Sequence, residues 1–168
     1  MSVVNRVSVL ALALVGALGI PSAATQAATA SDTFQVSITV QNSCAIVAND
    51  LGFGTVNTLV ANIDASSTVV VTCTGIGPLS VAFNAGTGTG SSLATRKMNS
   101  GASTIDYNLY TTAARTVILG DGTGGSAPLT GTSTGAADTF TVYGRVAAGQ
   151  NPKPAGTYTS DVIATVTF

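Results

Sequence analysis

Histidine, tryptophan and glutamate are absent from this 168-residue chain, and charged side chains of either sign are scarce. Six Lys and Arg residues stand against seven acidic residues, all of them aspartate, and charged residues make up 8% of the chain. A nucleic-acid-binding surface needs clustered basic residues, so this class of protein is excluded on electrostatic grounds. Helix formers such as Lys and Gln are also few, and the composition therefore favours an all-β protein.

The N-terminal residues have the pattern of a secretory signal peptide. Met1–Arg6 carries one cation, and the uncharged run Val7–Ile20 follows it. That run is shorter than the about 20 residues of a membrane-spanning helix, so we expect an exported protein whose mature form does not span the membrane. Ala28-Thr29-Ala30 fits the A-x-A cleavage pattern, which predicts residues 1–30 as the signal peptide and residues 31–168 as one domain by length.

Two segments alternate regularly between apolar and polar residues, as a β-strand with one buried face does. In Thr33–Val40 the apolar face consists of Phe34, Val36, Ile38 and Val40, and in Tyr158–Phe168 it consists of Tyr158, Val162, Ala164, Val166 and Phe168. Shorter strands are predicted at 45–47, 69–73, 79–83, 105–109, 116–119 and 140–146, with a long surface loop at 120–135. Short antiparallel strands separated by Gly and Pro turns predict an immunoglobulin-like β-sandwich.

The chain has two cysteines, Cys44 and Cys73. In an exported protein two cysteines most simply form one disulfide. A metal-binding or redox role is the alternative, but it has little support without a histidine or a C-x-x-C pair. We therefore expect a disulfide between Cys44 and Cys73, and no metal or other cofactor.

Three glycine-containing motifs resemble catalytic or binding loops but lack the residues that such sites need. Gly131–Gly135 matches the G-x-S-x-G pattern of serine hydrolases, yet the chain has no histidine to act as the general base, so we predict a plain loop. Gly86–Gly90 lacks the lysine and the helix of a phosphate-binding loop. Asp121–Gly125 offers one carboxylate where a calcium site needs several oxygen ligands. The last two are predicted to be turns.

The charged residues give no catalytic site either. Arg96-Lys97 is predicted to be a solvated charge pair on a hairpin. Asp106, Asp138 and Asp161 are too scattered in the sequence to be paired as catalytic carboxylates. The sequence therefore predicts that the protein is not an enzyme.

Several short segments, spread in order over nearly the whole predicted mature chain, together resemble one known family. They are Asn42-Ser43-Cys44, Leu51–Gly54, Arg96-Lys97-Met98, Ile105–Tyr110, Ala114-Arg115, Gly120–Gly125, Val142–Val146 with Ala148-Gly149-Gln150, and Gly156-Thr157-Tyr158 with Asp161 through Val166-Thr167-Phe168. In these segments the chain is similar to the spore coat U domain, a family that includes subunits of archaic chaperone-usher pili of the Csu type. No single short motif carries this resemblance.

The resemblance implies an incomplete immunoglobulin-like sandwich that lacks its last strand, so that a groove lies open along the core. In such pili a periplasmic chaperone fills the groove, and an outer-membrane usher then exchanges the chaperone strand for the N-terminal segment of the next subunit. Carried onto this chain, residues 31–43 are the donor segment and residues 44–168 the pilin domain. The inserting face is then Phe34, Val36, Ile38 and Val40, and the groove and chaperone edge is bordered by Tyr158, Val162, Ala164, Val166 and Phe168.

The function implied by the resemblance is that of a structural subunit of a surface pilus, serving adhesion and biofilm formation. The implied partners are the chaperone, the usher and identical or related pilin subunits, and the route leads through the periplasm to the cell surface. Two alternatives stay open. Thr33–Val40 could be the first strand of a self-contained sandwich, and the protein could be a monomeric secreted or coat-associated binding module. Loops 86–92 and 120–135 would then hold a ligand such as a glycan, although the chain has no tryptophan as a platform.

Overall fold

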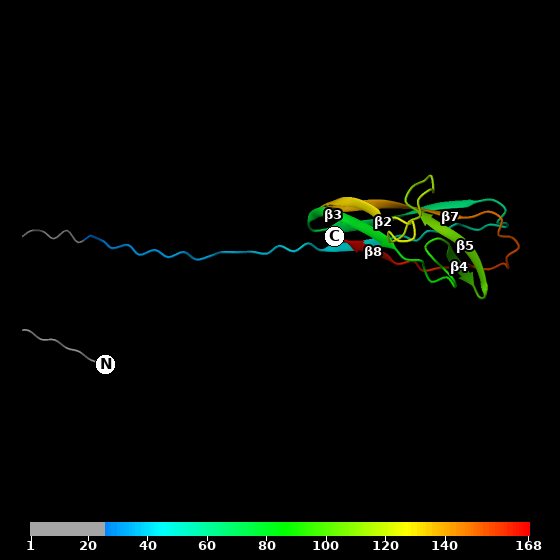
Figure 1. Cartoon of the computed structure of the whole chain (residues 1–168), viewed down its shortest axis with the longest axis horizontal. Helices are drawn as coiled ribbons and strands as arrows, with labels where there is room; N and C mark the ends of the chain where they lie inside the picture. The colour runs from blue at the N-terminus through cyan, green and yellow to red at the C-terminus, as the bar shows by residue number, and fades with distance from the viewer. Residues whose placement is uncertain (1–25) are drawn as a thin grey trace, which may run out of the picture. The chain divides into compact units, whose positions relative to one another are not determined.

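The computed structural model describes residues 26–168, and this part of the chain contains eight β-strands and no helix. The strands are β1 (Cys44–Ala48), β2 (Ile63–Cys73), β3 (Ile76–Phe83), β4 (Arg96–Ser100), β5 (Ser103–Tyr110), β6 (Leu129–Thr134), β7 (Ala137–Val146) and β8 (Ala164–Thr167). They form two antiparallel sheets, one of five strands in the order β1-β2-β7-β5-β4 and one of three strands in the order β6-β3-β8 (Figure 1). No helix that could cross a membrane occurs among these residues.

The chain divides after Ile38 into an N-terminal segment and a compact unit that begins at Thr39 and holds every strand. Most of the predicted signal peptide, 1–30, lies outside the described residues. Residues 26–43 contain no strand, so the predicted strand at Thr33–Val40 belongs to neither sheet.

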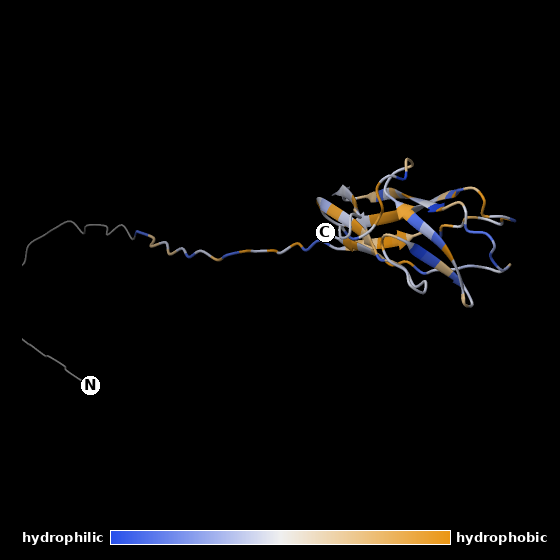
Figure 2. Ribbon diagram, turned by 45° about the vertical axis from the view of Figure 1, so that its right-hand side comes forward, coloured by the Kyte–Doolittle hydropathy of each residue, from blue (hydrophilic) through white to orange (hydrophobic). Residues whose placement is uncertain are grey.

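The core of the sandwich is built by alternate residues of strands from both sheets. Val71 of β2, Val81 of β3 and Val146 of β7 are between 0% and 2% exposed, whereas their neighbours along each strand are more open. Figure 2 shows this alternation as hydrophobic bands along the strands. The prediction of an all-β, immunoglobulin-like sandwich is confirmed, because a period of two places one face of each strand in the core.

Most of the predicted strands are confirmed, and three predictions are wrong. The segments 45–47, 69–73, 79–83, 105–109 and 140–146 lie within β1, β2, β3, β5 and β7. The predicted loop 120–135 contains β6, which pairs with β3. The predicted strand 116–119 forms only isolated bridges at Ile118 and Leu119. The final strand is shorter than predicted, because the ladder starts at Ala164 and the residues before it include only a bridge at Thr159.

The G-x-S-x-G motif, predicted to lie in a loop, is the second half of β6 and the turn that follows it. Ser133 is 1% exposed, and its hydroxyl donates a hydrogen bond of 2.9 Å to the carbonyl of Gly75. The hydroxyl therefore ties β6 to the turn between β2 and β3, and its burial explains the serine without catalysis.

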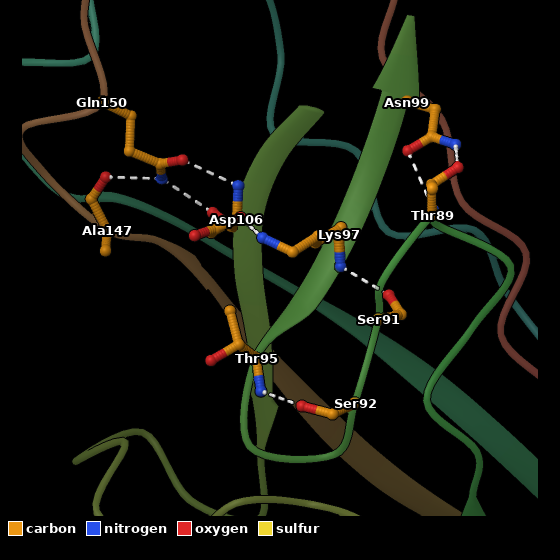
Figure 3. A network of polar contacts seen from close by, with 9 residues as sticks. All are labelled: Thr89, Ser91, Ser92, Thr95, Lys97, Asn99, Asp106, Ala147 and Gln150. Carbon is orange, nitrogen blue, oxygen red and sulfur yellow. Dashed lines mark hydrogen bonds and ion pairs between the residues drawn. The ribbon is translucent and has the colours of Figure 1, made fainter. Parts of the chain in front are cut away.

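The outer edge of the five-stranded sheet at β4 is covered by other parts of the chain. The Lys97 amide donates to Ser91 Oγ at 2.7 Å, and Asn99 exchanges two backbone hydrogen bonds of 2.9 and 3.0 Å with Thr159. Figure 3 shows Ser91 beside Lys97, and Thr89 beside the amide group of Asn99. The β4 edge thus has partners from within the domain.

On the side of β5 that faces β7, the side chain of Gln150 extends the ladder beyond the end of β7. Its Oε1 accepts from the Asp106 amide at 2.7 Å, and its Nε2 donates to the Asp106 carbonyl at 2.8 Å (Figure 3). A primary amide presents the same donor and acceptor as a peptide group, so Gln150 takes the place of a strand residue where β7 has ended.

Candidate strand-binding groove

A groove with a volume of about 1160 Å³ opens beside the sandwich core. Its two walls lack regular strand structure and consist of residues 48–59, which begin at the end of β1, and residues 153–162, which precede β8. Its floor is made of core side chains from both sheets, including Val69, Phe83 and Val146. An occupant of the groove would therefore pack directly against the hydrophobic core.

The first wall starts where β1 leaves its ladder, after Ala48. Leu51 and Phe53 pack over β7, and Gly144 of β7 gives them room, since a Cβ there would lie 2.9 Å from Leu51 Cδ2 and from Phe53 Cζ. The ring of Phe53 also meets that of Tyr107 edge to face, with 6.2 Å between the centroids. These contacts hold the wall against the core.

In the last part of the second wall, every second residue from Thr159 to Ile163 is bonded to an earlier part of the chain. The bonded pairs are Thr159 with Asn99, Asp161 with Thr87 and Ile163 with Asn84, at N···O distances of 2.9 to 3.1 Å. Successive residues of an extended chain direct their backbone groups to opposite edges. Ser160 and Val162 therefore direct their N–H and C=O groups to the groove side, where no described residue bonds them.

The same alternation leaves free edges on β8 and β1. Thr165 and Thr167 follow Ile163 in pairing toward β3, so the backbone groups of Ala164 and Val166 face away from it. Beyond β1, the Asn49 amide donates to the Thr68 carbonyl of β2 at 3.0 Å, which shows which residues of this ladder direct their backbone groups toward β2. The backbone groups of the alternate residues in β1 face away from β2 and are unpaired. The two strands lie beside each other, and the groove opens where β1 ends and β8 begins.

Two hydroxyl groups at the groove are buried without a hydrogen-bond partner among the described residues, those of Tyr107 and Ser160. Burial raises the pKa of Tyr107, so its hydroxyl stays protonated at neutral pH. The floor of the groove therefore contains the Tyr107 hydroxyl group and no charged side chain, since the charged lining residues Asp50, Lys153 and Asp161 belong to the walls. Such a floor favours uncharged, mainly apolar side chains.

Comparison with known proteins identifies the family of this domain. The sequence model of the Spore Coat Protein U domain matches residues 30–165. The chain belongs to this family. It is also 30% identical over 159 residues to Protein U of Myxococcus xanthus, in an alignment that covers 85% of this chain and 87% of Protein U. The predicted membership of the spore coat U domain family is confirmed.

A solved structure has a similar fold. It is the CsuC–CsuE chaperone–tip adhesion subunit pre-assembly complex from archaic chaperone-usher Csu pili of Acinetobacter baumannii, with a TM-score of 0.55 and 21% identity to the matching chain. The match covers 77% of this chain and 41% of the other, so this chain spans less than half the length of that relative. At this identity the comparison establishes a shared fold.

The five residues predicted to border the groove of this family member occupy different positions. Tyr158 and Val162 line the groove. Ala164 and Val166 lie in β8, half-buried against the core, and Phe168 is 54% exposed at the end of the chain. The sequence did not point to the opposite wall, 48–59, because that wall has no regular alternation and is placed by Gly144, far away in the sequence.

The predicted donor residues share one property, which is strong exposure. Phe34 is 86%, Val36 82%, Ile38 88% and Val40 85% exposed. Four large apolar side chains at every second position are thus open to solvent in a segment without strand pairing. Their role as a donor face stays a prediction.

The predicted disulfide is confirmed, since Cys44 and Cys73 are bonded and lie opposite each other in the β1–β2 ladder. Just before it, Asn42 Oδ1 accepts from the Gly75 amide at 2.8 Å, and the Ser43 amide donates to Thr74 Oγ1 at 3.0 Å. Hydrogen bonds to the rest of the compact unit therefore begin at Asn42, only two residues after Val40.

The prediction that Arg96-Lys97 is a solvated pair is wrong for Arg96. Arg96 is 0% exposed, while Lys97 is half-buried and forms an ion pair with Asp106 at 2.5 Å. Burial lowers the pKa of Arg96, which stays protonated because its ordinary pKa is so high. The one sequence signal for its burial was its spacing of two from Met98, which places both side chains on the same face of β4.

Proposed function

We propose that this chain is a structural subunit of a chaperone-usher pilus, assembled by donor-strand exchange. The observation that carries the proposal is the combination of an open groove over the core with an exposed, alternating apolar segment in the same chain. Each feature is unfavourable alone, since both leave apolar surface uncovered. A second copy of the chain resolves both when its N-terminal segment fills the groove.

The chemistry of the two parts is complementary. Ser160 and Val162 offer backbone groups along one wall, and a strand laid beside them gains ladder hydrogen bonds while every second side chain points to the core. Phe34, Val36, Ile38 and Val40 have that spacing. At roughly 1.5 to 3 kcal/mol per buried apolar side chain, they would contribute on the order of 6 to 12 kcal/mol before ordering costs.

The partners follow from the need to protect the groove before assembly. A periplasmic chaperone would occupy it after export by the signal peptide at residues 1–30, and an outer-membrane usher would replace the chaperone with the next subunit. The structural relative from Acinetobacter baumannii, a subunit in complex with its chaperone, supports this assignment. The completed fibre lies on the cell surface and serves adhesion and biofilm formation.

The alternative of a monomeric binding module has less support, because both loops that would bind its ligand, 86–92 and 120–135, contribute to the structure of the sandwich. Loop 86–92 covers the β4 edge through Ser91, and 120–135 contains β6. In addition, Asp121 Oδ1 accepts from both the amide and the hydroxyl of Thr123, which completes a local turn.

The test compares Ile38→Asp with Thr39→Asp. We expect the first variant to remain a chaperone-bound monomer, because a carboxylate would have to enter the apolar floor, and the second to assemble, because Thr39 lies on the opposite face. Electron microscopy of surface fibres and co-purification with the chaperone give the two readouts. Normal fibres from Ile38→Asp would exclude the donor role of this segment.

A further inference from the structure

We propose that Asn84, held in place by the buried Arg96, is a positioning residue that shapes the edge of the groove before a strand is added to it. This inference rests on the proposed function and names residues that act through the groove wall without lining its floor. Its basis is the way in which Ser160, Val162 and their neighbours are held although they belong to no regular ladder.

Asn84 holds both backbone groups of Ile163. The backbone N–H of Asn84 donates to the Ile163 carbonyl at 3.1 Å, and the Asn84 side-chain Oδ1 accepts from the Ile163 backbone N–H at 2.9 Å. The same Oδ1 also accepts from the Gly86 amide at 3.0 Å. A single asparagine thus joins the connection after β3 to the residue that leads into β8, in place of a ladder pair.

Arg96 fixes the other end of Asn84. Its Nε and Nη2 donate to the Asn84 carbonyl at 3.0 and 2.8 Å, and Nη2 also donates to the Leu119 carbonyl at 2.7 Å. Nη1 donates to Asn108 Oδ1 at 2.7 Å. The fully buried guanidinium group is therefore surrounded by carbonyl and amide oxygens. Its several N–H donors in one plane allow it to bond all of them at once.

The wall itself leaves no space for a different arrangement at Gly86. Its φ is +80°, and a Cβ there would lie 2.7 Å from Ser160 Oγ and 3.2 Å from Val162 Cγ2. The adjacent Thr87 accepts the Asp161 amide through Oγ1 at 2.9 Å. The connection 84–87 therefore packs closely against Ser160 and Val162, the two residues whose backbone groups face the groove.

These contacts give the groove edge its order in the absence of a ladder. An incoming strand then meets backbone groups of Ser160 and Val162 that already point outward, and it binds without first ordering them. Loss of the Asn84 side chain frees the Ile163 amide and loosens this wall, while the part of the floor formed by β5 and β7 keeps its own hydrogen bonds.

The experiment measures hydrogen–deuterium exchange in assembled fibres of the full chain, in three peptides: 33–41, 158–164 and 104–110. Asn84→Ala should speed exchange in the first two by about tenfold, as expected for the loss of one hydrogen bond, and leave the β5 peptide unchanged. Asn84→Asp keeps an acceptor oxygen and should restore the wild-type rates. Asn62→Ala is the matched control, because Asn62 Oδ1 also accepts a backbone amide, that of Ala148 at 2.9 Å, and neither residue lines the groove.

The inference is overturned if Asn84→Ala changes neither groove peptide, if it speeds the β5 peptide equally, or if Asn84→Asp behaves like Asn84→Ala. If Asn84→Ala does not assemble, peptide 158–164 is compared in the chaperone-bound subunits, where faster exchange confined to it supports the inference and uniform exchange contradicts it. Failure of the proposed function has a different signature, which is an unprotected 33–41 peptide in the wild-type protein.

Discussion

Along the outer edge of β4, Ser91 Oγ and the Thr159 carbonyl accept the backbone amides of Lys97 and Asn99, whereas no described residue bonds the free edge of β1 at the opposite end of the same sheet. Open edges are sites of unwanted association, and stable domains usually cover them. Here the chain covers β4 with a close-fitting loop, in which a Cβ at Gly88 would overlap the Lys97 carbonyl. The free edges of β1 and β8 lead into the two walls of the groove, since residues 48–59 begin at the end of β1 and residues 153–162 precede β8.

This difference shows that only some edges of the sandwich are left uncovered, and that these edges are the ones next to the groove. A chain that covers one edge with loop 86–92 and uses Gln150 to extend β5 has the means to cover its other edges. The unpaired edges of β1 and β8 meet the groove where β1 ends and β8 begins, so one added strand, as proposed above, would account for both. The predictions below test this contrast, from the largest expected effect to the smallest.

The largest effect is expected at the start of the bare β1 edge, where the Cys44–Cys73 disulfide holds the strand. Cys44→Ser should lower the free energy of unfolding of the exported subunit by roughly 3 to 4 kcal/mol, because the bridge closes a long loop in the unfolded chain. Urea denaturation with and without reductant measures this. The double variant Cys44→Ser/Cys73→Ser is the control and should not respond to reductant. An unchanged urea midpoint after reduction of the wild-type subunit would contradict the prediction.

The second prediction compares proline on the two kinds of edge. Val162→Pro removes an amide that no described residue bonds, so it should destabilise the chaperone-free domain no more than loss of the partly buried side chain does in Val162→Ala. It should also weaken assembly by about 1 to 3 kcal/mol through the lost ladder bond. Asn99→Pro removes the bond of 2.9 Å to the Thr159 carbonyl and should destabilise the domain itself. Fibre dissociation rates and urea midpoints separate the two effects.

Val162→Ala is the control for the side chain, since it keeps the amide. Fibres of Val162→Ala should dissociate more slowly than those of Val162→Pro. If proline at position 162 lowers the urea midpoint of the domain as much as proline at position 99, the two edges do not differ and the contrast fails.

The sequence was sufficient for the strands whose alternation is local. β2, β3, β5 and β7 all follow a period of two, and each was predicted within its observed bounds. β6 was missed because its sequence, Leu-Thr-Gly-Thr-Ser-Thr, has one large apolar residue, and its place is set by pairing with β3. Composition suggested a loop where tertiary pairing forms a strand.

The candidate site was harder to predict from the sequence, because its residues are far apart along the chain and come together only in the folded domain. Arg96 is buried by carbonyls of Asn84 and Leu119, which lie 12 and 23 residues away in the sequence. The wall at Leu51 depends on the absence of a side chain at Gly144. The buried face predicted from the alternation of Phe34, Val36, Ile38 and Val40 stays a prediction, because residues 26–43 are exposed on both faces.

The smallest effect is expected on the outer face of the sheet, away from both edges, where Asp64 accepts from Arg145 Nε and Nη2 at 2.7 and 2.8 Å and lies 3.3 Å from Arg115 Nη1. The hydrogen bond from Arg145, with the nearby charge of Arg115, holds the pKa of Asp64 below its ordinary value of 3.8. The folded state therefore binds this proton less readily than the unfolded state. The resulting stability is present above the unfolded pKa and is lost as the pH falls through the folded pKa.

Asp64→Asn should flatten this part of the pH dependence, with a small effect at neutral pH because the side chain is 37% exposed and the pair is screened by solvent. Thermal melting at low and high salt measures this pH dependence between about pH 2 and pH 6, a range that brackets the ordinary pKa of aspartate. The wild-type melting temperature should fall more steeply below about pH 4 than that of the variant, and high salt should reduce the difference. Identical profiles would mean that the ion pair does not stabilise the fold, and assembly should be unaffected in either case because Asp64 lies on neither edge of the groove.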